Sequence, residues 1–198
     1  MNLHIERVSF PYHKPFAITG RVYTSCDTIR VTVEKDGVQG VGEALGVDYL
    51  GESIDAIEGQ LEDMIGKLGA DPGEVDLQDL LAPGGARNAL DCALWDWRAK
   101  QSGQRVWELL DTAVAPVQTV FTIGIDVPEA MARSAAEAAR LPRLKIKLDA
   151  QQPIERLEAI RAARPDATLV VDVNQGWDIH ALRDYLPHLE RLGIAMLE

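Results

Sequence analysis

Cysteine is scarce in this sequence, and long hydrophobic runs are missing from it. The 198 residues include only two cysteines, Cys26 and Cys92, which are too few for a disulfide framework, so both are expected to be reduced thiols. No apolar stretch approaches the roughly 18 residues of a membrane-spanning helix, and the first residues, MNLHIERVSF, lack the pattern of a signal peptide. These absences predict a cytoplasmic protein that does not bind a membrane.

Positive charge is also in deficit. The chain has 20 Lys and Arg against 31 Asp and Glu, which gives a formal net charge of -11. Such a surface repels polyanions and leaves no basic stripe for phosphates, which argues against a nucleic-acid partner. What the chain does have is 46% hydrophobic residues and no low-complexity tract, a composition typical of a globular protein with a sizeable core.

The first part of the chain, residues 1–115, is predicted to contain strands followed by helices. Alternating apolar and polar residues predict three strands, at 3–10, 27–34 and 38–43. Asp36-Gly37 separates the last two and predicts a hairpin, because glycine tolerates the positive φ of such turns.

Two helices are predicted after these strands. From Ser53, apolar residues recur at helical spacing, namely Ile54, Ile57, Leu61, Ile65 and Leu68. After a Pro/Gly break at 83–85, a second helix carries an apolar face made of Ala89, Leu90, Ala93, Leu94 and Trp97. Gly103 is expected to end this helix. Residues 1–115 are therefore predicted to form an α+β domain.

From residue 116 to residue 198, strands and helices alternate. The predicted strands are 117–125, 143–149, 167–174 and 194–198, and the predicted helices between them are 128–140, 153–163 and 179–191. Repeated strand–helix units imply a parallel sheet. This pattern does not distinguish an open sheet from a closed barrel.

Two lysines of the segment RLKIKLD are candidates for chemistry. Lys145 and Lys147 are two residues apart, so a strand directs both to one face while Leu144, Ile146 and Leu148 point to the other. Taken alone, this pattern is more typical of a solvated edge strand with its lysines outward. The next two strands favour a functional interpretation.

Those strands add oxygen ligands at their carboxyl ends. Asp172 and Asn174 share one face at the end of the third strand, and the fourth strand ends in Glu198. Parallel α/β folds place their ligands at this edge of the sheet, and hard oxygen donors suit Mg²⁺. The alternative for Asp172 and Asn174 is that they cap the turn into the following helix.

These motifs together resemble the muconate-lactonizing branch of the enolase superfamily. The resemblance rests on K-I-K at 145–147, V-D-V-N-Q-G-W at 171–177 and M-L-E at 196–198. The segments GEALGVDYLGES, ARNALDCALWDWRAK and FTIGI resemble the dipeptide epimerases of that branch in particular. The resemblance implies an α+β capping domain at 1–115 and the first half of a (β/α)₈ barrel at 116–198. It also implies Mg²⁺-dependent epimerisation of a dipeptide by 1,1-proton transfer through an enediolate.

Individual roles follow from the same resemblance. Lys147 matches the acid/base lysine and Lys145 the first lysine of the pair, while Asp172 and Glu198 match two metal-ligating carboxylates. The residues expected near the substrate are Thr122, Asn174, Arg21, Tyr23 and Tyr49. The last three belong to loops at 18–24 and 45–52, which match the capping loops that select the substrate.

Several alternatives stay open. Cycloisomerisation or syn-dehydration uses the same lysines and metal ligands, and a non-catalytic truncated module is a further reading. A (β/α)₈ barrel has roughly 200–250 residues, so four of its eight strands are expected here, without the third metal carboxylate and the second acid/base lysine. The isolated chain is therefore expected to be unstable or associated.

The identity of the substrate is left open. Arg21 either pairs with an acidic substrate side chain or is solvated, so the dipeptide is undetermined. A homo-oligomer is possible, and its size is also undetermined.

Overall fold

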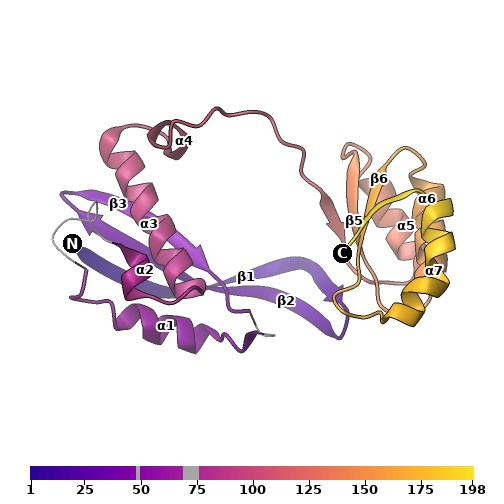
Figure 1. The fold of residues 1–198 in the computed structure, drawn as a ribbon, viewed down its shortest axis with the longest axis horizontal. Helices are drawn as coiled ribbons and strands as arrows, with labels where there is room; N and C mark the ends of the chain where they lie inside the picture. The colour runs from indigo at the N-terminus through magenta and orange to yellow at the C-terminus, as the bar shows by residue number, and fades with distance from the viewer. Residues whose placement is uncertain (48–49, 69–75) are drawn as a thin grey trace. The chain divides into compact units, whose positions relative to one another are not determined.

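The computed structural model describes residues 1–47, 50–68 and 76–198, and the chain divides into two compact units. Unit 1 comprises residues 1–11 and 25–115, and unit 2 comprises residues 12–24 and 116–198. Strands β1 and β2 contribute residues to both units (Figure 1). Within the described ranges, no helix has the length and apolar character needed to cross a bilayer.

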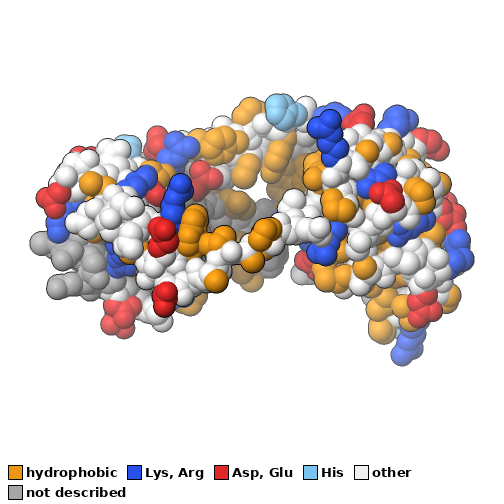
Figure 2. Space-filling model, turned by 90° about the horizontal axis from the view of Figure 1, so that it is seen from above, with side chains coloured by type: hydrophobic (Ala, Val, Ile, Leu, Met, Phe, Trp, Pro, Cys, Tyr) orange, Lys and Arg blue, Asp and Glu red, His pale blue; other side chains and the backbone are white. Residues whose placement is uncertain are grey.

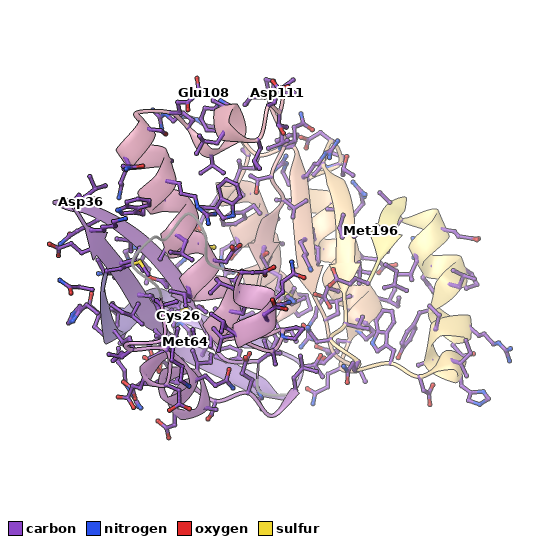
Figure 3. All side chains as sticks on the ribbon, turned by 60° about the vertical axis from the view of Figure 1, so that its left-hand side comes forward. Cys26, Asp36, Met64, Glu108, Asp111 and Met196 are labelled. Carbon is purple, nitrogen blue, oxygen red and sulfur yellow. The ribbon has the colours of Figure 1, made fainter. Side chains whose placement is uncertain are left out.

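Unit 1 is built on a three-stranded sheet in the order β1-β2-β3. Its strands are β1 (Asn2–Ile18), β2 (Arg21–Lys35) and β3 (Val38–Ala44). β2 and β3 pair antiparallel from Ile29 opposite Ala44 to Lys35 opposite Val38. The turn between them has positive φ at Asp36 (54°) and Gly37 (75°), which confirms the predicted hairpin. Asp36 is labelled at this turn in Figure 3.

The first two strands are longer than predicted. Residues 18–24, predicted to form a loop, are strand except for a two-residue turn at Thr19 and Gly20, where Gly20 has a φ of 73°. Most side chains between residues 7 and 15 are exposed. An exposed strand has no apolar alternation, so backbone pairing extends it without a signal in the sequence.

Four helices of unit 1 lie within the described residues. They are α1 (Ile54–Glu62), α2 (Leu77–Leu80), α3 (Gly85–Ser102) and α4 (Val106–Leu109). α1 is shorter than the predicted periodicity because turns follow it, including Gly66 at a φ of 81°. Ile65, predicted on the buried face, is 58% exposed, and Met64 is buried in its place (Figure 3).

Helix α3 packs closely on strand β3. Its predicted apolar face is fully buried, and Gly103 ends the helix with a left-handed φ of 68°. Two glycines of β3 permit the close approach. A Cβ on Gly40 would lie 2.1 Å from the carbonyl oxygen of Ala93, and one on Gly42 would lie 1.9 Å from that of Ala89. The helix backbone therefore occupies the space that side chains on β3 would need.

Unit 2 contains a four-stranded sheet in the order β4-β5-β6-β7, and all its neighbouring strands are parallel. The strands are β4 (Phe121–Ile123), β5 (Arg143–Lys147), β6 (Thr168–Asp172) and β7 (Ile194–Leu197). The connecting helices are α5 (Pro128–Glu137), α6 (Pro153–Ala163) and α7 (Ile179–Arg191). Figure 1 shows these helices together on one side of the sheet.

The predicted elements of unit 2 are all present, but some are shorter. β4 covers three residues of the predicted 117–125; Val117 is 92% exposed, and among the described residues no strand pairs with it. α5 ends at Glu137 rather than Arg140, while α6 and α7 have the predicted bounds. On the face that Figure 2 shows, acidic and basic side chains are interspersed over this unit.

The core of unit 2 decides where the lysines lie. Leu144, Ile146 and Leu148 are fully buried in the cluster between the sheet and its helices. Because side chains alternate along a strand, Lys145 and Lys147 lie on the opposite face, away from the helices.

Candidate active site

Strand register brings the candidate residues of unit 2 to one edge of the sheet. On β5, Lys145 is paired with Thr122 of β4, and Lys147 is paired with Asp172 of β6. β7 continues the ladder, because the backbone N–H of Glu198 donates to the carbonyl of Val171 at 2.8 Å. Four successive strands therefore deliver polar side chains near their carboxyl ends.

Asp172 lies between the two lysines. Its Oδ2 atom lies 2.6 Å from Nζ of Lys147 and 2.9 Å from Nζ of Lys145. Lys145 also donates to Oε2 of Glu198 at 2.6 Å. The Asp172 side chain is 4% exposed, so its negative charge is stabilised by the two ammonium groups rather than by water.

Asn174 completes the cluster through its backbone and its side chain. Its Oδ1 atom accepts a hydrogen bond from Lys147 at 2.9 Å, and its backbone N–H donates to Oδ1 of Asp172 at 2.9 Å. Asn174 and Gln175 have positive φ values of 43° and 64°. Asparagine tolerates the left-handed region better than most residues, so the residue type suits both the turn and the contact.

The contacts shift two pKa values in opposite directions. The hydrogen bond to Glu198 raises the pKa of Lys145 above its ordinary value, and Asp172 adds to the shift against the effect of burial. Burial raises the pKa of Asp172, but hydrogen bonds from Lys147, Lys145 and the Asn174 N–H outweigh it, so that the pKa lies below its ordinary value. Both groups are therefore held in their charged forms.

The donor set has the chemistry that a hard divalent cation requires. Asp172 and Glu198 already converge on one positive charge, the ammonium of Lys145, and Asn174 supplies an amide oxygen beside them. Carboxylate and amide oxygens are preferred by Mg²⁺. Across 1–47, 50–68 and 76–198, no group of three His, Cys, Asp or Glu side chains is placed to hold a metal ion. The cluster thus fits part of a magnesium site.

The predicted substrate residues outside the cluster are placed as follows. Thr122 is half-buried on β4 beside Lys145. Arg21 is exposed at the start of β2, and Tyr23 is half-buried two residues later, both in the hairpin segment of unit 2. Tyr49 lies outside the described residues.

Thr19 was not singled out from the sequence. Its hydroxyl lies 2.9 Å from the carbonyl oxygens of both Leu148 and Val173, which follow Lys147 and Asp172 directly. Gly20, which follows Thr19, is a turn signal, but only the fold reveals that this turn reaches the strand ends of unit 2.

The fold and the cluster together define an enolase-superfamily architecture, with a capping domain followed by part of a (β/α) barrel. The model of the "mandelate racemase / muconate lactonizing enzyme, N-terminal domain" matches residues 1–111, and that of the "enolase C-terminal domain-like" family matches residues 129–198. The chain belongs to the mandelate racemase / muconate lactonizing enzyme family. This confirms the resemblance and the fold class predicted from the motifs.

Relatives and solved structures are similar over nearly the whole chain. The L-Ala-D/L-Glu epimerase of Escherichia coli is 38% identical over 193 residues, which are 96% of this chain and 60% of that protein. An enolase family member from Agrobacterium tumefaciens, solved with sodium and L-Ala-L-Glu, is 35% identical with a TM-score of 0.91, covering 98% of this chain and 60% of that one. The dipeptide epimerase of Enterococcus faecalis, complexed with Mg and L-Leu-L-Tyr, is 26% identical with a TM-score of 0.89, covering 98% and 59%.

The chain corresponds to only part of the length of these relatives. It spans about 60% of the length of the E. coli epimerase and of the A. tumefaciens protein. The comparisons therefore apply to the capping domain and to the first strands of the barrel.

Proposed function

We propose that the full-length protein is a dipeptide epimerase that uses Mg²⁺, with residues 1–115 as its capping domain and 116–198 as the first half of its barrel. The observation that carries the proposal is the cluster of Lys145, Lys147 and Asp172 at the carboxyl ends of adjacent parallel strands, where barrel enzymes perform their chemistry. The two free cysteines agree with a reducing compartment such as the cytoplasm.

Lys147 is the proposed acid/base. It donates to Asp172 and Asn174, and as the ammonium it would deliver a proton to the α-carbon on one face of the substrate. Abstraction by the neutral amine is the reverse step. Inversion needs a second acid/base on the opposite face, and both lysines of this cluster lie on one strand, so the partner group comes from elsewhere in the protein.

Asp172 and Lys145 have supporting roles in this proposal. Asp172 contacts both ammonium groups and fixes the direction of the Lys147 side chain. Lys145, on β5, forms a salt bridge with Glu198, which follows β7. Asp172 and Glu198 would hold Mg²⁺, with Asn174 beside them. When bound, the dication would neutralise the negative charge that develops on the substrate carboxylate as its α-proton leaves.

The experiment that tests this function is a screen of L,L-dipeptides with the full-length protein in D₂O. Proton NMR would show loss of the α-proton signal and appearance of the second epimer. Arg21 and Tyr23 would be varied next, because the hairpin that carries them is the proposed selector of the dipeptide side chain.

A parallel arm offers a cyclic diene acid and a succinyl-cyclohexadiene acid, which are substrates for cycloisomerisation and syn-dehydration. Epimerisation of a dipeptide with no turnover of these acids would support the proposal. Turnover of either acid without epimerisation of any dipeptide would replace it with that reaction, and inactivity in both arms would favour a non-catalytic module.

A further inference from the structure

The tip of the β1–β2 hairpin is bound to three successive strand ends of unit 2. The N–H of Ile125, just after β4, donates to the carbonyl of Ala17 at 2.8 Å. The hydroxyl of Thr19 lies 2.9 Å from the carbonyl oxygens that follow β5 and β6, those of Leu148 and Val173. A hydroxyl has one proton, so these two carbonyls share it.

The two carbonyls belong to peptide groups next to the proposed catalytic residues. Leu148 directly follows Lys147, and its N–H donates to the backbone carbonyl of Asp172 at 3.1 Å. The carbonyl of Val173 and the N–H of Asn174 are parts of one planar peptide group. That N–H donates to Oδ1 of Asp172 at 2.9 Å. One peptide group therefore connects the Thr19 hydroxyl with the carboxylate that holds both lysines.

The fit between the turn and the β6–α7 loop is close. A Cβ built on Gly176 would lie 3.1 Å from both the hydroxyl oxygen and the methyl carbon of Thr19, and 2.8 Å from the carbonyl oxygen of Val173. Glycine at position 176 thus allows Thr19 to reach Val173, while Asn174 keeps its left-handed conformation two residues earlier.

We propose that Thr19 is a positioning residue, which fixes the backbone around Lys147 and Asn174 and so aims the ammonium of Lys147 at the substrate. The proposal rests on the proposed epimerase function. It assigns a second task to the hairpin: besides facing the substrate, the hairpin sets the geometry of the acid/base group. Small displacements of a reacting group lower the reaction rate by large factors, so the loss of one hydroxyl is expected to slow proton transfer measurably.

The test uses the full-length protein and two substitutions. Thr19→Val keeps the shape of the side chain but removes the hydroxyl, whereas Thr19→Ser keeps the hydroxyl. α-Proton exchange in D₂O is measured separately for the two epimers of a substrate dipeptide. Thr19→Val is expected to slow exchange from the epimer served by Lys147 by about tenfold, with a smaller change for the other epimer and a nearly unchanged KM. Thr19→Ser is expected to restore the rate.

The matched control is Thr168→Val, at the exposed start of β6 four residues before Asp172, and it should leave both exchange rates unchanged. Equal slowing for both epimers in Thr19→Val, failure of Thr19→Ser to restore the rate, or no effect of Thr19→Val would each overturn the proposal.

A second readout does not depend on turnover. Amide hydrogen exchange at Asn174 is expected to accelerate in Thr19→Val and to stay at the wild-type rate in Thr19→Ser, because only the valine releases the peptide group. If the wild-type protein epimerises no dipeptide, the proposed function fails, but this measurement still decides the positioning role. Unchanged amide exchange in Thr19→Val would show that Thr19 does not fix that peptide.

Discussion

Lys147 and Asp172 are register partners on neighbouring parallel strands, and Nζ of the lysine lies 2.6 Å from Oδ2 of the carboxylate. The pairing of β5 with β6 therefore also sets the separation of two side chains in the candidate active site. A slip of one residue in this register would turn Lys147 to the opposite face of the sheet. The chemistry of the site thus depends on the same backbone ladder that holds the sheet together.

Replacing Lys147 with alanine is expected to abolish α-proton exchange from one epimer of the substrate while the protein stays folded. The substitution removes one acid/base group on one face of the substrate, and the Lys147 side chain contributes little to the apolar core, which lies on the other face of β5. Proton NMR in D₂O follows the exchange from each epimer, and circular dichroism follows the fold.

Lys100→Ala is the control for this prediction, because Lys100 is a half-exposed lysine paired with Asp96 on α3. Its exchange rates should equal those of the wild type. Undiminished exchange from both epimers in Lys147→Ala would show that another group is the base.

Asp172→Asn is expected to weaken Mg²⁺ binding to the full-length protein. Loss of an outer-shell partner typically costs roughly 10–100-fold in metal affinity, and loss of an anionic ligand should cost at least as much. Titration calorimetry measures the change without any substrate. Asp184→Asn, on the exposed side of α7, removes the same charge elsewhere and should leave the affinity unchanged. Equal affinities for the two variants would contradict a role of Asp172 as a ligand.

Arg164→Met is expected to destabilise the protein by about 3 kcal/mol. The buried guanidinium donates to the carbonyls of Ala138 and Leu141 at 2.8 and 3.0 Å, and it pairs with Asp166. Methionine fills much of the space but removes both donors; the carbonyl of Leu141 loses its bond from Arg164, while that of Ala138 keeps the one from the Leu141 N–H. Urea unfolding measures the loss. Arg140→Met, at an exposed position, should change the free energy of unfolding by less than about 0.5 kcal/mol.

Asp166 should make the stability depend on pH in acid. The hydrogen bond from Arg164 lowers the pKa of Asp166 below its ordinary value. A lowered native pKa stabilises the fold above the unfolded pKa, about 3.9, and the stabilisation is lost as the pH falls through the native pKa. The difference in unfolding free energy between wild type and Asp166→Asn should therefore shrink below about pH 4. A difference in unfolding free energy that grows as the pH falls would contradict a lowered pKa of Asp166 in the folded protein.

Two glycines should respond in opposite ways to alanine. Gly42→Ala would place a Cβ 1.9 Å from the carbonyl oxygen of Ala89, and forcing α3 away is expected to cost about 3 kcal/mol. Gly59 lies within α1, and apart from its chain neighbours and the helix's own backbone no atom of the described residues lies within 4 Å of the corresponding position, so Gly59→Ala should stabilise by up to about 1 kcal/mol. Thermal unfolding distinguishes the two. A neutral Gly42→Ala would mean that α3 can move away at little cost.

The sequence predicted best what depends on hydrophobic period and strand parity. The buried face of α3, the bounds of α6 and α7, and the lysines on the face of β5 opposite Leu144 and Ile146 all follow from those two patterns. The family resemblance added the roles, and those remain proposals.

The sequence was least informative about exposed strands, which pair through their backbone without an apolar pattern, and about contacts between residues far apart in the chain. The extension of β1 and β2 lacks an apolar pattern, so residues 18–24 looked like a loop. Ile65 fits the period of α1, yet the helix ends before it. Thr19 meets Leu148 across 129 positions of sequence, and no local pattern reports such a contact.

Neither unit is one uninterrupted stretch of chain, because residues 12–24 belong with the second unit while the chain on both sides of them belongs with the first. A gene fragment that begins at Pro116 would therefore encode the strands with their lysines but omit the turn that contacts three of the strand ends. Exchanging segments with a relative at the obvious junction would likewise combine a hairpin from one parent with strand ends from the other. Chimeras that carry residues 12–24 together with their own strands keep that interface matched.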